Sequence, residues 1–207
     1  MKIVPMKIEL QQYTYYPDED EMLTSVGMIA GECYNSSMDN DKCIKRALNC
    51  IKRGHHSPWE HVNITLKCTV DRGVSHALVR HRHCAFQQSS TIYQKFDECE
   101  FINLDTEDLE LDLNRLDAYK QAEISYHKLL EAGEPPSAAR DVLPNALATN
   151  LIITTNIRQW MYMIQRRCGP GDSDNMHMWC MMTRAFFEKL YPQVTKAFDD
   201  WYSSHPL

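Results

Sequence analysis

The sequence predicts an α+β fold, a single domain in which a mixed or antiparallel sheet is flanked by helices. Strand-like alternation and helix-like periodicity are interspersed along the chain, and no repeat or long linker divides it. Hydrophobic residues make up 43% and charged residues 24% of the sequence, as in an ordinary globular protein. A chain of 207 residues can bury one sizeable core, so we expect one domain over residues 1–207.

Apolar spacing predicts the elements of the N-terminal half in order. Some segments alternate with the period of a strand, and others repeat apolar residues at helical spacing. Gly54 is a natural stop for the second helix, because glycine readily adopts the left-handed conformation found at helix ends. The predicted elements are a strand over 1–13, helices over Asp20–Tyr34 and Asp39–Arg53, a strand over 62–70 and a short helix over Val74–Arg80.

The C-terminal half opens with a long amphipathic pattern that Gly133 ends. Pro135 and Pro136 then start a short helix, which Pro144 closes. The further predicted elements are a helix over 107–132, a strand over Leu147–Thr155, a helix over Asn156–Arg167 and, after a break with an N-cap over Cys168–Asp174, a last helix to about Leu190. One side of the long helix is expected to face the core through Leu113, Leu116, Tyr119, Tyr126, Leu129 and Leu130.

Composition argues against several classes of function. A formal net charge of −6 and a pI near 5.8 do not suit binding to a nucleic acid polymer or to an anionic membrane. No apolar run is long enough to cross a bilayer, and the N-terminal residues lack the apolar core of a signal peptide. We therefore expect a cytoplasmic protein whose 8 cysteines are free thiols. Cys168, His177 and Cys180 fit no standard zinc spacing, so no metal site is predicted.

The most informative segment is a run of basic residues, Arg80-His81-Arg82-His83, with a polar run from Gln87 to Thr91 behind it. Neighbouring guanidiniums and imidazoles repel one another unless an anion neutralises them, and phosphate suits the arginine fork. Amide and hydroxyl side chains then offer donors and acceptors to a base or a ribose. A basic run alone is commonly a solvated turn, whereas the polar residues behind this one indicate a ligand site.

Three further polar clusters stand at the ends of predicted elements, where functional sites are commonly built. They are His55–His61, Arg140 and Asn156–Arg167. The chain has no Walker loop, no GxGxxG turn and no serine–histidine–aspartate pattern. It is therefore equipped to hold a phosphorylated cofactor and a nucleotide rather than to supply a protein nucleophile.

Over about residues 25–200 the chain resembles the flavin-dependent thymidylate synthases. The signature of that family is Arg-His-Arg, seven intervening residues and Ser, matched here by Arg80-His81-Arg82 and Ser90. The upstream segment of the family is similar to Gly54-His55, Ser57-Pro58 and Glu60-His61. Downstream blocks match in order at Arg140, Asn156-Ile157-Arg158 and Arg167.

The resemblance implies a homotetramer around a mixed α/β core that makes dTMP from dUMP with FAD, methylenetetrahydrofolate and NADPH. Ser90 and Arg167 would act at the reacting nucleotide, with Ser90 as a positioner and not as a covalent nucleophile. The residues implied for FAD are His55, Ser57, Glu60, Arg80, His81, Arg82, Gln87, Asn156, Arg158 and Tyr162, with His55 near the ring where folate stacks. Those implied for dUMP are Gln88, Ser90, Arg140 and Arg167, and Lys95 is added as this chain's own candidate for the phosphate.

The chain departs from the family pattern where the nucleotide is bound. Most members have Arg at position 92, where it reaches the dUMP phosphate, and here the residue is Ile92. A lost charged hydrogen bond costs about 1.5–3 kcal/mol, and Lys95, three residues on, or Arg166 could offset it. Gln88 carries no charge where other members have Glu or Gln, and Tyr162 replaces a family Asn.

These departures leave alternatives open. One is a flavin and folate enzyme that acts on a different pyrimidine nucleotide. Another is a non-catalytic homologue that still binds nucleotide or flavin. A third, of a different class, is a zinc-stabilised interaction protein.

Overall fold

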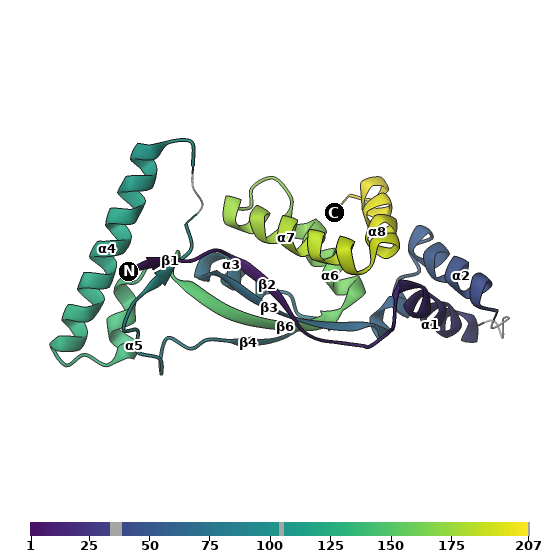
Figure 1. Ribbon diagram of the computed structural model, residues 1–207, viewed down its shortest axis with the longest axis horizontal. Coiled ribbons are helices and arrows are strands. Elements are labelled where there is room, and N and C mark those ends of the chain that lie inside the picture. The colour runs from purple at the N-terminus through teal and green to yellow at the C-terminus, as the bar shows by residue number, and fades with distance from the viewer. Residues whose placement is uncertain (34–38, 104–105, 207) are drawn as a thin grey trace. The chain divides into compact units, whose positions relative to one another are not determined.

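The computed structural model describes residues 1–33, 39–103 and 106–206, and it confirms the α+β class (Figure 1). A four-stranded antiparallel sheet has the strand order β2-β3-β6-β4, and a second sheet pairs β1 with β5 in parallel. The strands are β1 Lys2–Ile3, β2 Lys7–Tyr13, β3 Asn63–Asp71, β4 Ala85–Gln88, β5 Glu100–Phe101 and β6 Ala148–Asn156.

The chain forms two compact units. Unit 1 contains Met1–Lys7, Lys67–Arg82 and Phe86–Ile152, and unit 2 contains Ile8–Leu66, His83–Ala85 and Ile153–Leu207. Strands β3 and β6 each pass from one unit to the other along the chain. The single domain over residues 1–207 stays a prediction, as does assembly into a homotetramer.

Unit 2 is mainly helical. Its core is aromatic, and Trp59, Trp160 and Trp179 are fully buried. The indole nitrogen of Trp160 donates to the carbonyl of Ile64 at 3.1 Å, which ties a helix to strand β3 without leaving that polar atom unpaired. The helices of unit 2 are α1 Glu19–Glu32, α2 Asn40–Lys52, the 3₁₀ helix η1 Ser57–His61, α6 Ile157–Arg167, α7 Asp174–Leu190 and α8 Pro192–Ser204.

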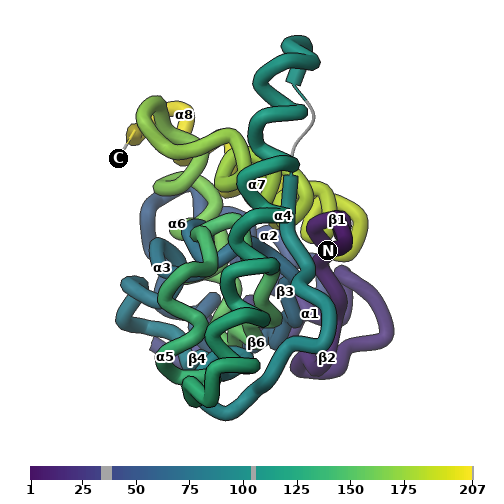
Figure 2. Tube along the Cα trace, turned by 90° about the vertical axis from the view of Figure 1, so that its left-hand side faces the viewer, coloured from purple at the N-terminus to yellow at the C-terminus, as the bar shows by residue number. Residues whose placement is uncertain are grey.

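Unit 1 has a smaller apolar core of its own, in which Phe101 stacks on Tyr119 with ring centroids 5.0 Å apart. Figure 2 shows the short helix α5 beside the long helix α4. The fully buried members of this core are Cys99, Phe101, Tyr126, Ala139 and Leu147. The helices of unit 1 are α3 Arg72–Leu78, α4 Leu109–Glu131, α5 Pro136–Ala139 and the 3₁₀ helix η2 Arg140–Val142.

Most predicted helices are confirmed to within a few residues because their ends carry clear signals. Helix α2 starts where the Asp39 carboxylate accepts from the backbone N–H of Lys42 at 3.1 Å. It ends before Gly54, whose φ of +73° is the left-handed conformation expected there. Helix α1 ends at Glu32, and the predicted end at Tyr34 lies outside the described residues. None of the described helices combines the length and apolar character that crossing a membrane requires.

Several predictions about elements were wrong. The expected first strand is two strands in different sheets, separated at Pro5, which has no N–H to donate to a ladder. The helix before the basic cluster starts at Arg72 and not Val74, because the Asp71 carboxylate caps it by accepting from Val74 N–H at 2.7 Å. On the long helix Tyr126 is buried as expected, whereas Leu113 is 56% exposed. Four described elements were not predicted: β4, β5, the 3₁₀ helix η1 and the terminal helix α8.

Helices α1 and α2 cross at Gly27, which gives a test of the packing. A Cβ built at Gly27 would lie 2.0 Å from the backbone oxygen of Cys43, so alanine requires the helices to separate. We expect Gly27→Ala to lower the free energy of unfolding by about 1–3 kcal/mol in denaturant titrations. The control is Gly169→Ala, where the nearest atom, the Arg166 oxygen, is 4.0 Å away. Equal stability of the two variants would contradict this packing.

Candidate functional site

The basic signature follows directly after helix α3. The backbone N–H of His81 donates to the Leu78 carbonyl at 3.1 Å, which continues the turn beyond the helix end. His81 is 8% exposed, whereas Arg80 and Arg82 on either side of it are exposed. The middle residue of the signature is therefore an anchor, and it leaves two guanidiniums available to an anion.

Gln88, at the end of β4, is fixed by two hydroxyl groups of unit 1. Its amide nitrogen donates to Ser75 Oγ at 2.9 Å and to Thr149 Oγ1 at 3.3 Å. Ser75 Oγ in turn donates to the carbonyl of Arg72 at 3.0 Å. A carboxylate at position 88 has no hydrogen to donate to these acceptors. The uncharged amide is therefore matched to its surroundings here, and neither Ser75 nor Thr149 was singled out from the sequence.

The turn after β4 meets Arg140, another residue implied for the nucleotide. Arg140 Nη1 donates to Thr91 Oγ1 at 2.8 Å, and its Nε donates to the Ser137 carbonyl at 3.1 Å. Ser90 Oγ accepts from the backbone N–H of Ile92 at 3.1 Å, which tightens the turn. The structure thus brings Arg140 to the Ser90 turn, and Thr91 is the contact that sequence reasoning missed.

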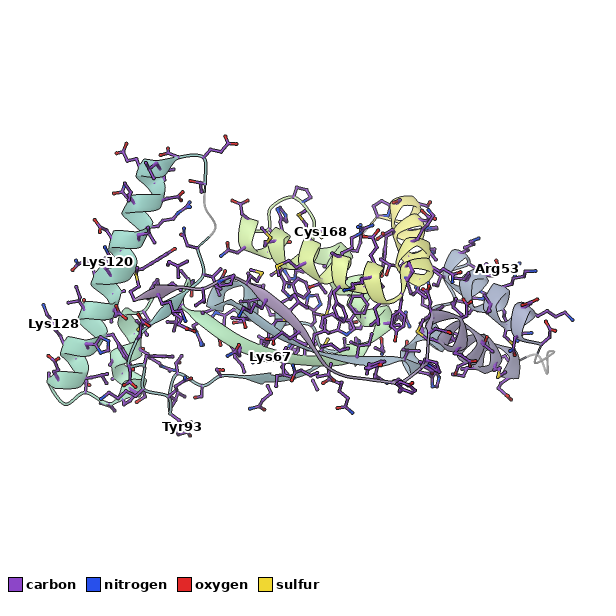
Figure 3. All side chains as sticks on the ribbon, viewed as in Figure 1. Arg53, Lys67, Tyr93, Lys120, Lys128 and Cys168 are labelled. Atoms are coloured by element: carbon purple, nitrogen blue, oxygen red, sulfur yellow. The ribbon has the colours of Figure 1, made fainter. Side chains whose placement is uncertain are left out.

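Beyond this turn the side chains face solvent. Ile92 is 45% exposed and Tyr93 is 88% exposed, and Figure 3 shows Tyr93 directed away from the ribbon. Because it is exposed, the Ile92 side chain does not contribute to the hydrophobic core. Position 92 is therefore available for substitution with little structural cost.

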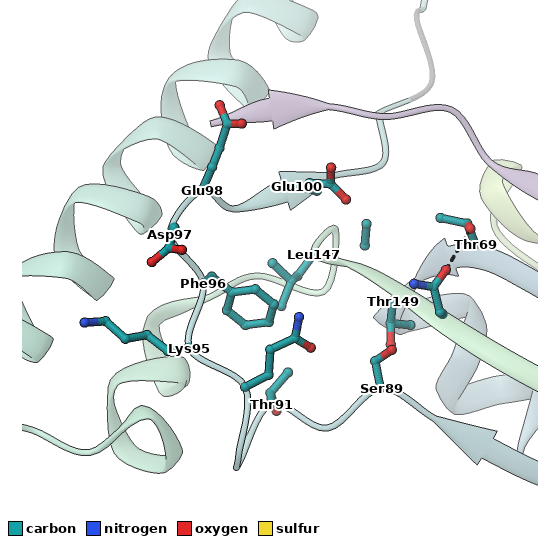
Figure 4. Close-up of a pocket in the computed structure, with 13 residues that line it drawn as sticks. Thr69, Ser89, Thr91, Lys95, Phe96, Asp97, Glu98, Glu100, Leu147 and Thr149 are labelled. Atoms are coloured by element: carbon teal, nitrogen blue, oxygen red, sulfur yellow. Dashed lines mark hydrogen bonds between the residues drawn. The ribbon is translucent and has the colours of Figure 1, made fainter.

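A cavity of about 330 Å³ lies beside the same turn in unit 1 (Figure 4). Hydroxyl and amide groups line much of it, and Thr69 Oγ1 donates to Asn150 Oδ1 at 2.9 Å across β3 and β6. Phe96 and Leu147 supply apolar surface, and three carboxylates, Asp97, Glu98 and Glu100, line another part. Lys95 also lines the cavity, but Figure 4 shows its side chain directed away from the Phe96 ring.

In unit 2 the residues implied for flavin meet at the start of helix α6. Asn156 caps this helix, because its side-chain oxygen accepts from Gln159 N–H at 2.9 Å. Arg158, in the first turn, forms an ion pair with Glu60 of η1. Tyr162 follows four residues later on the same side of the helix and is 36% exposed. Ser57 opens η1, where Pro58 occupies a first-turn position.

The two neighbouring histidines before η1 have opposite environments. His55 is exposed, whereas His56 is 6% exposed and packs edge-on against Phe198 and Trp201, with ring centroids 5.1 and 4.5 Å away. His56 Nε2 also lies 3.2 Å from the Ile51 carbonyl oxygen. Burial lowers the pKa of His56, and the hydrogen bond with Ile51 opposes this only in part. His56 is thus a structural residue, and His55 is the histidine that a ligand can reach.

Helix α6 ends at Arg167, which the resemblance implies for the nucleotide. Arg167 Nη1 lies 3.7 Å from Asp172 Oδ1, across a turn in which Gly171 has φ of +100°. The turn is also held by His177, whose Nε2 lies 3.1 Å from the Gly169 carbonyl oxygen. A hydrogen bond with Cys180 lowers the pKa of Cys168. The segment Cys168–Asp174, which contains two glycines and a proline, therefore places Asp172 where it orients Arg167.

The implied site residues accordingly fall in both units. Unit 1 holds Arg80, His81, Arg82, Gln87, Gln88, Ser90, Lys95 and Arg140. Unit 2 holds His55, Ser57, Glu60, Asn156, Arg158, Tyr162 and Arg167. Within units, contacts join Gln88 to its two hydroxyl partners, Arg140 to Thr91, and Arg158 to Glu60. The roles implied for these residues stay predictions.

Comparison with known proteins identifies relatives along most of the chain. The family model described as "Thymidylate synthase complementing protein" matches residues 10–193. The flavin-dependent thymidylate synthase of Synechocystis sp. is 26% identical over 199 residues, covering 87% of this chain and 93% of that protein. The flavin-dependent thymidylate synthase of Geobacter sulfurreducens is 30% identical over 176 residues, covering 79% and 74% respectively.

A solved structure has a similar fold. It is a UMP/dUMP methylase, PolB, from Streptomyces cacaoi, bound with 5-Br dUMP, and it matches with a TM-score of 0.81. The match covers 97% of each chain at 20% sequence identity. Identity this low shows a common fold and leaves the ligand to be argued from the residues.

Burial of His56 predicts how stability depends on pH. Because the folded state lowers the pKa of His56, the unfolded chain binds the proton more readily, and stability falls as pH drops below about 6.5, the ordinary histidine value. One such proton contributes at most about 1.4 kcal/mol per pH unit. We expect His56→Gln to flatten the fall in unfolding free energy between pH 7 and pH 5.5. Ile153→Val, which weakens the same unit without removing a titrating group, should keep the wild-type slope. An unchanged slope in His56→Gln would refute the assignment.

Proposed function

The chain belongs to the thymidylate synthase complementing protein family, and from this membership we propose that it methylates the pyrimidine ring of dUMP, with FAD as cofactor and methylenetetrahydrofolate and NADPH as co-substrates. The observation that carries the proposal is the organisation of unit 1 around the signature. Arg80 and Arg82 are exposed next to a buried His81, and Gln88 and Arg140 are each held by neighbouring hydroxyl groups.

The residues present suit FAD by their chemistry. Arg80 and Arg82 offer guanidiniums to the pyrophosphate. Arg158 is held by Glu60, and Tyr162 presents an aromatic ring on the same side of α6. His55 is accessible beside η1. When bound, the flavin supplies the hydride chemistry that amino acid side chains cannot.

The role of the protein is then to bind and orient the nucleotide. Arg140 keeps a fixed direction because Thr91 and the Ser137 carbonyl both accept from it. Such a positioned cation stabilises negative charge that develops on a uracil carbonyl or rests on a phosphate. Ser90, tied to the Ile92 backbone, acts as a positioner. Arg167, beside Asp172, is a second oriented guanidinium.

A second candidate substrate is another pyrimidine nucleotide, for instance UMP. Ile92 motivates it as a departure from the family pattern at the nucleotide site, although UMP, dCMP and dUMP carry the same 5′-phosphate. The similar fold of the UMP/dUMP methylase PolB also supports it. A non-catalytic homologue is the third possibility, and it differs from both by binding flavin without turnover.

The proposed function can be tested by following the absorbance of the bound flavin. We expect the purified protein to be yellow, and anaerobic reduction by NADPH to be faster with dUMP than without it, because the nucleotide completes the site. The measurement is absorbance of the oxidised flavin over time, repeated with UMP and dCMP. Acceleration by UMP or dCMP alone favours the second candidate. Reduction that no nucleotide accelerates favours the non-catalytic homologue, and a protein that takes up no FAD refutes the proposal.

Ile92 gives a second test. We expect Ile92→Arg to tighten dUMP binding roughly 10-fold or more, since a charged hydrogen bond contributes about 1.5–3 kcal/mol. Ile92→Gln is the control, because it adds polarity and length without charge. Both variants should keep wild-type stability, as Ile92 is 45% exposed. Equal dissociation constants for the two variants, measured by calorimetry, would show that the phosphate does not approach position 92.

A further inference from the structure

A hollow of about 380 Å³ in unit 2 lies on helix α2, next to the end of helix α1. Four cationic residues of α2 and its C-cap line it, Lys42, Lys45, Arg46 and Arg53, together with His55. No carboxylate is among the described residues that line it. We call it the α2 hollow. It is distinct from the cavity beside the Ser90 turn, where three carboxylates are present.

The cations share one side of the helix because of their spacing. Positions 45 and 46 both lie one turn after 42 and one turn before 49, and 53 lies one turn after 49, while Cys43, Ala47 and Ile51 form the buried side. Like charges one turn apart, such as Lys42 and Arg46, weaken a helix by a few tenths of a kcal/mol per pair, roughly. The chain as a whole carries a net charge of −6, so this gathering of cations is local.

Hydrogen bonds fix the residues that line the α2 hollow. Arg46 Nη1 donates to the Gly27 carbonyl at 2.8 Å, at the point where the two helices approach most closely. At the other end, His55 N–H donates to the Cys50 carbonyl at 2.8 Å, so the turn at Gly54 brings His55 to the hollow. Figure 3 shows Arg53 at this end of α2. Burial raises the pKa of the Cys50 thiol, while the positive charges of Arg46 and Arg53 act in the opposite direction.

We propose that the α2 hollow binds an oligoanion, and that its ligand is the chain of glutamate carboxylates carried by the folate co-substrate. The choice of ligand rests on the proposed function, together with the resemblance, which implies that folate stacks near His55. Several carboxylates along a flexible chain match several cations along a helix face, and together they bind better than one pair because the second contact is intramolecular. A ligand bearing several phosphates would present the same charge, so the experiment separates the two sources.

The test is equilibrium binding to the FAD-loaded protein by calorimetry, which needs no turnover. The probes are pteroyl-monoglutamate, pteroyl-pentaglutamate, inorganic pyrophosphate and adenosine 2′,5′-bisphosphate. We expect the pentaglutamate to bind at least 10-fold more tightly than the monoglutamate at low salt, with the preference shrinking as salt rises. Lys42→Glu/Lys45→Glu should abolish the preference. The matched control, Lys189→Glu/Lys196→Glu, changes the same charge on α7 and α8 and should retain it.

The outcomes are distinct. A pentaglutamate preference lost only in the α2 variant supports the folate tail. Binding of pyrophosphate or the bisphosphate lost only in that variant, without a pentaglutamate preference, supports the oligoanion site but overturns the choice of folate. Equal loss in both double variants overturns the site, as does the absence of both a pentaglutamate preference and binding of pyrophosphate or the bisphosphate. Since binding is measured directly, a protein that binds the pentaglutamate but does not reduce flavin would fail the proposed function and keep this inference.

Discussion

The pairing of β3 with β6 is the constraint on which the functional segments depend. These strands are neighbours in the central sheet, and polar side chains join them as well as backbone bonds: Thr65 and Thr154 share a hydrogen bond of 2.9 Å, and Thr69 donates to Asn150. Segments implied in function stand at their ends. Strand β3 follows η1 and leads into α3 and the basic signature, while β6 follows Arg140 and leads into α6. A slip in the register of this strand pair would therefore shift the strand ends at which most of the implied site residues begin or follow.

Helices and long strands could be predicted from the sequence because their signals are local. Apolar periodicity with a cap at Asp39 and a glycine at 54 determines α2, and alternation determines β3. The elements that were missed or wrongly predicted are determined by tertiary contacts, or have a sequence signal that fits two interpretations. Strand β4 has only 4 residues, two apolar and two polar, so it is too short for alternation to reveal it and is defined by its pairing in the sheet. The last predicted helix ends near Leu190, so α8, in which Pro192 occupies a first-turn position that suits proline, was missed. The Leu113 side of α4 looks like a core stripe in sequence and is exposed in this chain.

The same distinction between local signals and tertiary contacts applies to the candidate site. The residues able to bind a nucleotide or a flavin could be predicted from their types and their order in the sequence. The run Arg80–His83 stood out because neighbouring positive charges repel one another unless an anion is bound. Their partners were not, since Thr91 and Arg140 are 49 residues apart and Gln88 and Thr149 are 61 apart. The two histidines at 55 and 56 show the limit most clearly. They are adjacent and chemically identical, and His56 is the one that packs against the rings of Phe198 and Trp201 and contacts the Ile51 carbonyl.

The exposure pattern of β3 bears on the motions that this arrangement permits. Ile64, Leu66, Cys68 and Val70 are fully buried along the strand, so its amides belong to the part of a protein that exchanges hydrogen only when the fold opens widely. The Ser90 turn lies outside it and reaches solvent at Ile92 and Tyr93. Opening of this turn would break contacts such as the hydrogen bond between Arg140 and Thr91, but not the pairing of β3 with β6. A ligand that binds the turn therefore draws on local stability and not on the cooperative stability of the strand pair.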